Sequence, residues 1–227
     1  MKSIALALVG GNTIPRARRQ ARAWAAAPVL ADTLAKLIVV VLFSALAYRL
    51  ANDWLVTGHV TGLLLLASES LVVAFTLVRR SASTVDRTWT ARLLTGFSTF
   101  GPNLVAPVAI GALASQEVTL AICGIGLVIV VLGKLSLGRS FGLQPANRGI
   151  VSTGLYNVVR HPIYLGYLFT HAGFVLANPS GWNLFAIAAA DLALMLRAVR
   201  EEQTLVKDDA YRSYTERVHW RVVPGVF

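Results

Sequence analysis

Long apolar segments alternate with short polar connections along most of the chain. A helix that crosses a membrane needs about 20 predominantly apolar residues, and four segments approach that length, at roughly 30–50, 60–78, 93–114 and 118–135. Two shorter apolar segments follow at 162–177 and 182–199, joined by a polar turn. The pattern predicts an all-α, polytopic integral membrane bundle of about six spans, within a range of five to seven.

Composition supports this interpretation. Hydrophobic residues make up 56% of the chain and charged residues 14%, whereas soluble domains carry about 25% charged residues. The values exclude an ordinary soluble enzyme and a disordered chain. The single cysteine, Cys123, excludes an intramolecular disulfide and disfavours cysteine-based metal chemistry.

The distribution of basic residues predicts the orientation in the membrane. The net charge is +10, which in a soluble protein would suggest nucleic acid. Here, the outer connections at 51–59, 115–117 and 178–181 contain no Lys or Arg, while most basic residues lie on the opposite side. This is the arrangement expected when basic residues gather in the cytoplasm. We therefore predict cytoplasmic N- and C-termini and no nucleic-acid partner.

Two polar stretches, 136–161 and 200–227, flank the last pair of apolar segments. A helical hairpin over 162–199 would bring both stretches to the same membrane face. Gly149 and Gly154 permit tight turns in the first stretch, and Pro162 suits the first position of a helix. We divide the chain into N-terminal membrane helices at 1–135, with a basic lead-in over 1–28, and a C-terminal region at 136–227.

The order of residues in this C-terminal region resembles a known family. It contains G-x-Y-x-x-V-R-H-P-x-Y-x-G from Gly154 to Gly166, an Asn-Pro turn, R-x-x-x-E-E-x-x-L from Arg197, and a tail beginning with Tyr211. This combination is similar to the integral-membrane methyltransferases, which include isoprenylcysteine carboxyl methyltransferase and the phospholipid N-methyltransferases. The resemblance covers about 137–227, and the earlier spans match only in being hydrophobic.

The resemblance implies a cytoplasmic-face site for S-adenosylmethionine. It places Glu201 in the acidic position that contacts the cofactor, and Arg197 where the family has a substrate-facing, catalytic arginine. No metal is implied. The other residues implied to bind the cofactor are Gln144, Arg148, Gly149, Ile150, Val151, Tyr156, Arg160, His161, Pro162, Ile163 and Tyr164. The family has a histidine where Arg148 stands.

Simpler interpretations exist for several of these residues. Arg160 and the nearby tyrosines are typical of membrane interfaces, and Tyr211 and Tyr214 are expected to pack the tail against the bundle.

Glu69 lies within a predicted span, where a carboxylate is energetically costly and therefore indicates function. Pairing of Glu69 with Lys36 is an equally good explanation. The same ambiguity holds for Asp191 with His171. Two further features are open: Gly126 and Gly133 suit helix contacts within or between chains, and Asn103 lies between Pro102 and Pro107, which suggest a kink.

The expected function is methyl transfer from S-adenosylmethionine to an amphipathic, lipid-like or prenylated acceptor dissolved in the membrane. No dedicated base is evident, which favours a carboxylate acceptor slightly over a phospholipid amine. Two alternatives remain. Membrane sterol reductases resemble the same C-terminal half but use NADPH, and a non-enzymatic small transporter would use Glu69.

Overall fold

The computed structural model describes residues 73–80, 82–105, 111–142 and 145–227, together with Ser70, Leu71 and scattered positions between 33 and 55. The chain divides into two compact units, Met1–Leu42 and Phe43–Phe227, and every element named below belongs to the second. Several predictions fall outside the described residues: the basic lead-in, Glu69, Pro107, Gln144 and most of the first two spans.

The third predicted span begins as a helix but ends early. Helix α3 covers Trp89–Phe100, and the Thr88 side chain caps it by accepting a hydrogen bond from the Ala91 N–H. It is followed by the 3₁₀ turn η1, Gly101–Leu104, which carries Pro102 in its first turn. Because proline has no N–H and clashes with the preceding turn, an α-helix does not continue through it. The prediction of one helix over 93–114 was therefore wrong beyond Phe100, and residues 111–115 are not helical.

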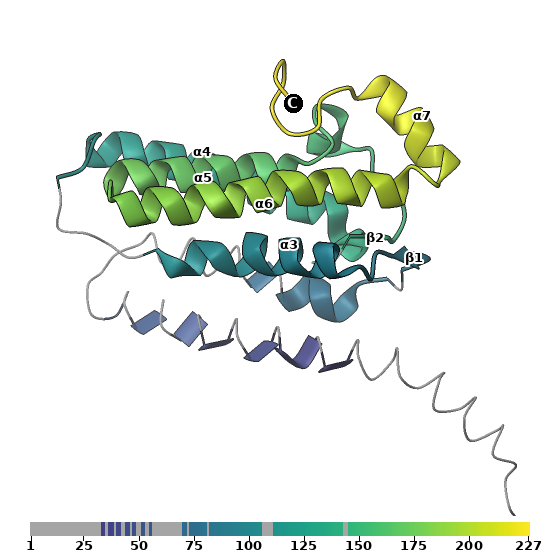
Figure 1. Ribbon diagram of the computed structural model, residues 1–227, viewed down its shortest axis with the longest axis horizontal. Helices are drawn as coiled ribbons and strands as arrows, with labels where there is room; N and C mark the ends of the chain where they lie inside the picture. Colours follow the sequence, from purple (N-terminus) through teal and green to yellow (C-terminus); the bar gives the residue numbers. More distant parts are fainter. Residues whose placement is uncertain are drawn as a thin grey trace, which may run out of the picture. The chain divides into compact units, whose positions relative to one another are not determined.

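Three long helices form the centre of the described structure (Figure 1). Helix α4 covers Gln116–Leu137 and ends at Gly138, whose φ of 49° favours glycine. Helix α5 covers Pro162–Ala177, as predicted, with Pro162 in its first turn. Helix α6 covers Gly181–Leu205, begins at the Ser180 cap, and continues well past the predicted end at 199.

Glycines bring α4 and α5 into close contact. A Cβ atom on Gly126 would lie 2.6 Å from the carbonyl oxygen of Gly166, and one on Gly133 would lie 2.8 Å from the Ile163 side chain. Small residues at such positions let helix backbones approach closely in a membrane. These two glycines thus mediate a contact within the chain.

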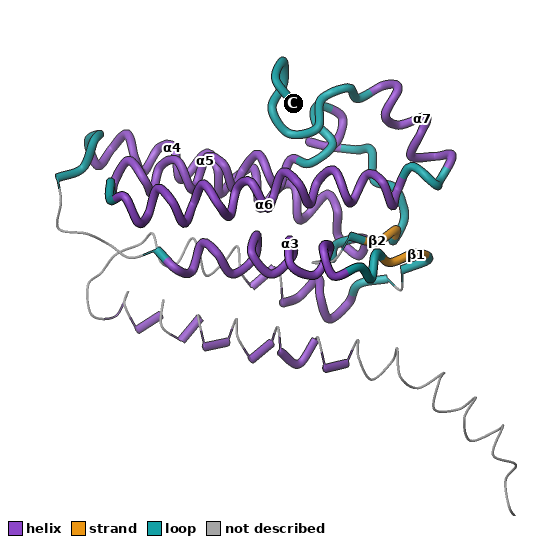
Figure 2. The backbone as a smooth tube through the Cα atoms, in the orientation of Figure 1, coloured by secondary structure: helices purple, strands orange, loops and turns teal. Residues whose placement is uncertain are grey.

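Short elements gather at the end of the bundle where α6 terminates (Figure 1). They are strands β1 (Thr84–Val85) and β2 (Ala146–Asn147), which pair antiparallel, the turns η2 (Gly138–Ser140) and η3 (Gly154–Asn157), and helix α7 (Asp209–Arg217). The all-α prediction did not include the two strands, although helices make up most of the described backbone (Figure 2). On α7, Tyr211 and Tyr214 are buried with Val218 in one cluster, which confirms that they pack the tail.

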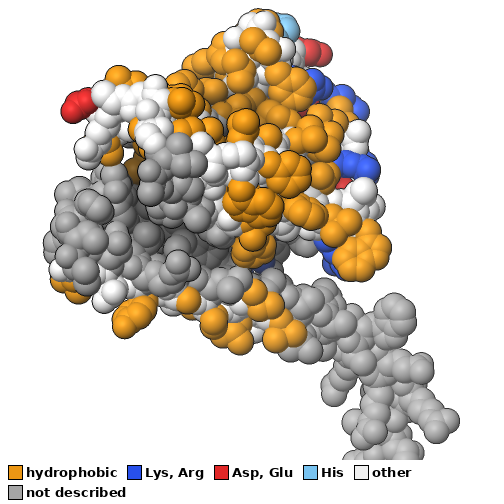
Figure 3. All heavy atoms as spheres, turned by 60° about the vertical axis from the view of Figure 1, so that its left-hand side comes forward, with side chains coloured by type: hydrophobic (Ala, Val, Ile, Leu, Met, Phe, Trp, Pro, Cys, Tyr) orange, Lys and Arg blue, Asp and Glu red, His pale blue; other side chains and the backbone are white. Residues whose placement is uncertain are grey.

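Two helical segments within the described chain are long and apolar enough to cross a membrane: Gln116–Ser140, which is α4 with η2, and Gly181–Leu205. Helix α5 has 16 residues, about 24 Å at 1.5 Å per residue, and is short for a bilayer core of about 30 Å. Hydrophobic side chains cover much of the described surface in Figure 3, as contact with lipid requires. The six-span topology and its orientation stay predictions.

Candidate functional site

Glu202 is the centre of a charged cluster at the end of α6. Its Oε2 atom accepts hydrogen bonds from Arg160 at 3.1 Å and from Arg221 at 2.8 Å, and its Oε1 atom lies 3.3 Å from His161 Nε2. The side chains of Glu202 and Arg160 are each 10% exposed. Buried charges are stable only when paired, so this carboxylate is committed to its neighbours within the protein.

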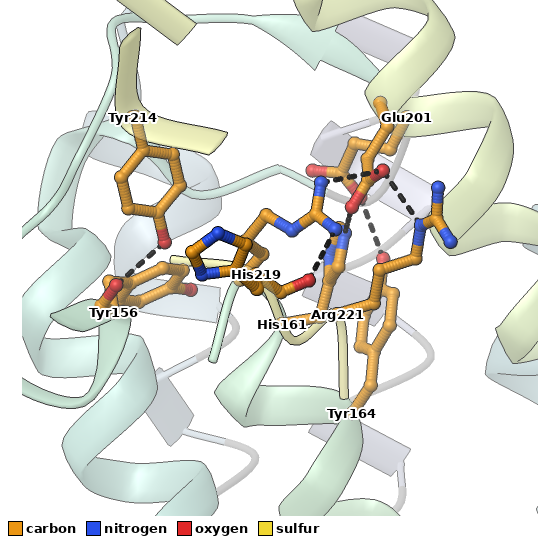
Figure 4. Close-up of polar contacts among 9 residues, drawn as sticks. Tyr156, His161, Tyr164, Glu201, Tyr214, His219 and Arg221 are labelled. Atoms are coloured by element: carbon orange, nitrogen blue, oxygen red, sulfur yellow. Dashed lines mark hydrogen bonds and ion pairs between the residues drawn. The ribbon is translucent and has the colours of Figure 1, made fainter. Parts of the chain in front are cut away.

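The same cluster joins the C-terminal tail to the start of α5. The backbone N–H groups of Arg160 and His161 donate to the carbonyl oxygens of Trp220 and Arg221 at 2.9 and 2.7 Å. The Arg160 guanidinium also donates to the His219 carbonyl at 2.9 Å (Figure 4). His161, which precedes Pro162, is not helical, with φ −130° and ψ 62°, and its backbone runs beside the tail.

The neighbouring carboxylate, Glu201, has different surroundings. Its Oε2 atom accepts a hydrogen bond from the Tyr164 hydroxyl at 2.8 Å (Figure 4). The carbon at the centre of the Arg197 guanidinium lies 5.5 Å from the centre of the Tyr164 ring, which is a cation–π distance. Glu201 is half-buried, and no cation among the described residues forms an ion pair with it. Its carboxylate therefore retains capacity to bind a further polar group.

Arg197 is buried, and its charge is not neutralised by a carboxylate within the described chain. It donates one hydrogen bond, from Nη1 to the Ser98 hydroxyl on α3 at 3.3 Å, and its Nε has no hydrogen-bond partner there. The Arg197 side chain thus bridges α3, α5 and α6. A guanidinium in this state is suited to an anionic group.

Tyr156 connects the loop to this site. It is buried in η3, and its carbonyl accepts a hydrogen bond from the Tyr214 hydroxyl at 2.7 Å. Burial raises the pKa of the Tyr156 phenol well above its usual value, and the charge of Glu201 raises it further. Tyr156 therefore lies within electrostatic reach of Glu201 and stays protonated.

The loop before Tyr156 is held by polar contacts on both sides. Asn147 donates to Asp208 at 2.8 Å and accepts from the Gly149 N–H at 2.9 Å, while the Ser140 hydroxyl donates to the Arg148 carbonyl at 3.1 Å. Gly149 has a φ of 100°, which requires glycine. Ile150 packs against the tyrosine cluster of α7.

The structure brings together six of the predicted residues: Tyr156, Arg160, His161, Tyr164, Arg197 and Glu201. It places Ile163 away from this group, since that side chain packs against Gly133 on α4. Pro162 is buried at the helix start and Val151 is half-buried. The cofactor roles of all these residues stay predictions.

Sequence reasoning missed Glu202 and Arg221. The signal for Glu202 was present: it stands eleven residues after Asp191, or three helical turns, and so lies on the same face of α6. That face meets α5, because the Asp191 carboxylate lies 2.6 Å from His171 Nδ1. The suspected Asp191–His171 contact is thereby confirmed.

Across the described part of the chain, no group of three or more His, Cys, Asp or Glu side chains is arranged to hold a metal ion. Where α5 begins and α6 ends, Arg160, His161 and Arg221 instead contact Glu202.

One family model matches the region that builds this site. Residues 115–212 match the phospholipid methyltransferase family. The match runs from the start of α4 into α7, so it includes Arg148, Tyr156, Arg197 and both glutamates. No curated protein matches the chain.

The family match confirms the resemblance to membrane methyltransferases of the phospholipid and isoprenylcysteine type. It supports a methyltransferase that is associated with the membrane and acts on a lipid. The polar contacts described above lie within or beside the matched region, where α5 begins and α6 ends.

Proposed function

We propose that the protein transfers a methyl group from S-adenosylmethionine to a lipid-like acceptor, and that the site is the polar cluster between α5 and α6. The observation that supports this proposal most strongly is the contrast between two adjacent carboxylates. Glu202 is saturated by Arg160, His161 and Arg221, whereas Glu201 is held by the Tyr164 hydroxyl and is otherwise available.

The chemistry of these side chains suits the cofactor. S-adenosylmethionine presents a sulfonium, an ammonium, a carboxylate and ribose hydroxyls. Glu201 can accept hydrogen bonds from hydroxyl or ammonium groups and offset positive charge. The buried Arg197 Nε without a partner is a donor available to an anionic group. Tyr156 and the loop around Gly149 would border the cofactor.

When bound, the cofactor supplies an electrophilic methyl group. The residues of the chain then have three tasks: to hold the two reactants in line, to exclude water and to balance charge. The Tyr164 hydrogen bond fixes the Glu201 carboxylate, and the Arg197–Tyr164 contact fixes the guanidinium beside it. The Glu202 cluster fixes His161 and the tail, and so positions the start of α5.

The location supports an acceptor that reaches the site from the bilayer. Helix α6 has 25 residues, about 37 Å at 1.5 Å per residue, so a span that starts at Gly181 passes through the bilayer core before Glu201. The site would then lie at the membrane surface, where a soluble cofactor and a membrane lipid can meet. The predicted orientation makes this the cytoplasmic face.

Isothermal titration calorimetry on the full chain in detergent tests the cofactor. We expect S-adenosylmethionine to bind the wild type in the micromolar range, and Glu201→Gln to weaken binding at least tenfold. Glu216→Gln is the matched control, because Glu216 is exposed on α7, and it should bind as the wild type does. Equal binding by both variants would remove Glu201 from the site. Binding of NADPH in place of S-adenosylmethionine would favour the reductase.

A further inference from the structure

A serine on α3 contacts the guanidinium of Arg197. The Ser98 hydroxyl accepts a hydrogen bond from Arg197 Nη1 at 3.3 Å, and it donates one to the carbonyl oxygen of Thr95, one turn earlier on α3, also at 3.3 Å. A serine hydroxyl has one hydrogen to donate. Because that hydrogen is used within α3, the hydroxyl oxygen presents a lone pair to Arg197 and is oriented as an acceptor for the guanidinium.

Close packing of α3 against α6 holds the two partners of this bond in place. Three pairs of residues connect the helices in antiparallel order: Leu104 with Trp182, Gly101 with Ala190, and Ser98 with Arg197. A Cβ atom on Gly101 would lie only 3.0 Å from that of Ala190, so the two helices are in close contact there. The position of Ser98 is thus determined by helix packing as well as by its bond to Arg197.

The guanidinium that Ser98 contacts belongs to the candidate site. Arg197 is 6% exposed, and its guanidinium carbon lies 5.5 Å from the centre of the Tyr164 ring. The Tyr164 hydroxyl in turn donates to Glu201 at 2.8 Å. Arg197 and Glu201 stand four residues apart on α6 and share one face of the helix. These contacts connect Ser98 to the Glu201 carboxylate through two side chains.

The hydrogen bond to Ser98 determines how the guanidinium is turned. A guanidinium carries five N–H donors in a planar fork. A cation–π contact is set mainly by distance from the ring, so the Tyr164 ring alone leaves the fork free to rotate. Among the described residues, Nη1 donates to Ser98 and Nε has no partner. Fixing Nη1 therefore determines the direction in which the remaining N–H groups point.

We propose that Ser98 is a positioning residue for the acceptor, and that its hydroxyl holds the Arg197 guanidinium so that the remaining N–H groups bind an anionic group of the acceptor. The inference rests on the proposed function. Ser98 lies before the region 115–212 that matches the methyltransferase family. Helix α3, an element outside that region, thus sets the affinity for the acceptor.

Initial rates of methyl transfer test this role. The donor would be tritiated S-adenosylmethionine, and the acceptor probe phosphatidylethanolamine at varied mole fraction in uncharged dodecyl maltoside micelles. We expect Ser98→Ala to raise the KM for phosphatidylethanolamine at least fivefold, while kcat and the Kd for S-adenosylmethionine change less than twofold. A contact made equally in the ground and transition states affects KM and leaves kcat unchanged.

Two further variants separate positioning from a structural role. Ser98→Thr keeps the hydroxyl and should restore the KM of the wild type. Thr99→Val is the matched control, because it removes the neighbouring hydroxyl on α3, which forms no hydrogen bond with Arg197 in the described structure. A purely structural role of Ser98 would lower the unfolding temperature of Ser98→Ala and leave its KM unchanged.

A second readout needs neither cofactor nor acceptor. The six tyrosines would be replaced by 3-fluorotyrosine, and the Tyr164 resonance would be assigned in the fluorine NMR spectrum by its loss in Tyr164→Phe. Fluorine chemical shifts respond to nearby charge. We therefore expect Ser98→Ala to move the Tyr164 resonance in the same direction as Arg197→Gln does, and Thr99→Val to leave it in place.

Three results would overturn the proposal: an unmoved Tyr164 resonance in Ser98→Ala, an unchanged KM in that variant, or a raised KM that Ser98→Thr does not restore. Failure of the proposed function is recognised separately, as wild type that binds no S-adenosylmethionine or transfers no methyl group. In that case the Tyr164 resonance decides alone: a shift in Ser98→Ala supports the positioning of Arg197, and an unmoved resonance refutes it.

Discussion

The Tyr164 hydroxyl on α5 donates a 2.8 Å hydrogen bond to the Glu201 carboxylate on α6, whereas the next residue, Glu202, pairs with three basic side chains. Adjacent positions on a helix point about 100° apart. Glu202 therefore faces the charged cluster formed with the tail, and Glu201 faces the proposed site. We therefore propose that Glu202 stabilises the fold and that Glu201 binds the ligand.

This assignment predicts opposite effects for two substitutions of the same kind. Glu202→Gln leaves Arg160 and Arg221 without a counter-charge and should destabilise the protein by about 2–3 kcal/mol, because breaking a buried ion pair costs about 3–5 kcal/mol and Arg221 is partly exposed. Glu201→Gln should change stability by less than about 0.5 kcal/mol. Thermal unfolding in detergent measures both, and equal losses would contradict the assignment.

Removing the tyrosine hydroxyl that holds Glu201 should weaken cofactor binding without unfolding the protein. A hydrogen bond to a charged group contributes about 1.5–3 kcal/mol, and Glu201 is half-buried, so we expect Tyr164→Phe to raise the Kd for S-adenosylmethionine about five- to tenfold. Calorimetry measures the change. Tyr211→Phe is the control, since the Tyr211 hydroxyl has no hydrogen-bond partner among the described residues. A comparable loss in this control would mean that the effect is not local.

The two tyrosines of α7 should differ in their contribution to stability. Tyr214→Phe removes the hydrogen bond to the buried Tyr156 carbonyl and should cost about 1–2 kcal/mol, while Tyr211→Phe should be neutral or slightly stabilising. Thermal unfolding of the two variants at neutral pH tests this. The prediction is wrong if the order is reversed.

Alkaline pH should destabilise the tail through ionisation of Tyr214. Burial raises the pKa of Tyr214 to about 12 from an ordinary value of about 10. A raised pKa favours the protonated form in the folded state, so this contribution is complete below about pH 10 and is lost as the pH rises towards 12. Ultraviolet titration of tyrosinate absorbance, with Tyr214→Phe for comparison, should show one fewer late-ionising group in the variant.

Two glycines on α4 provide a test of the helix packing. An added Cβ at Gly126 would meet the Gly166 carbonyl at 2.6 Å, whereas one at Gly124 would meet nothing within 4 Å. We expect Gly126→Ala to destabilise the α4–α5 contact by about 1–3 kcal/mol. Gly124→Ala should be neutral or stabilising by up to about 1 kcal/mol. Similar unfolding temperatures for the two variants would contradict the packing.

The sequence predicted those features that local chemistry determines. Pro162 at the first position of α5 follows from its fixed φ and missing N–H, and the end of α4 follows from Gly138. The joint pattern around Arg160, Tyr164 and Glu201 correctly indicated which residues gather at one end of the bundle. The polar stretches 136–161 and 200–227, which flank the α5–α6 hairpin, also lie at the same end of the bundle, as predicted (Figure 1).

Features that depend on distant partners were not predictable from the sequence. Glu201 and Glu202 are chemically identical. Residues distant in sequence decide which of them is paired: Arg160 and His161 before α5, and Arg221 in the tail. The β1–β2 ladder joins Thr84 to Asn147 across more than 60 residues and consists of two residues in each strand, too few for an alternating pattern. The span at 93–114 was predicted from hydrophobicity alone, and Pro102 interrupts the helix within it.

We propose that the polar cluster where α5 begins and α6 ends carries out methyl transfer from S-adenosylmethionine to a membrane lipid. The most direct measurement is the transfer of a tritiated methyl group from this cofactor to organic-extractable lipid in proteoliposomes of phosphatidylethanolamine. The account predicts time-dependent labelling by the wild type and by Glu216→Gln, with the rate reduced at least 100-fold in Glu201→Gln. Undetectable labelling by folded wild type, or an unchanged rate in Glu201→Gln, would contradict it.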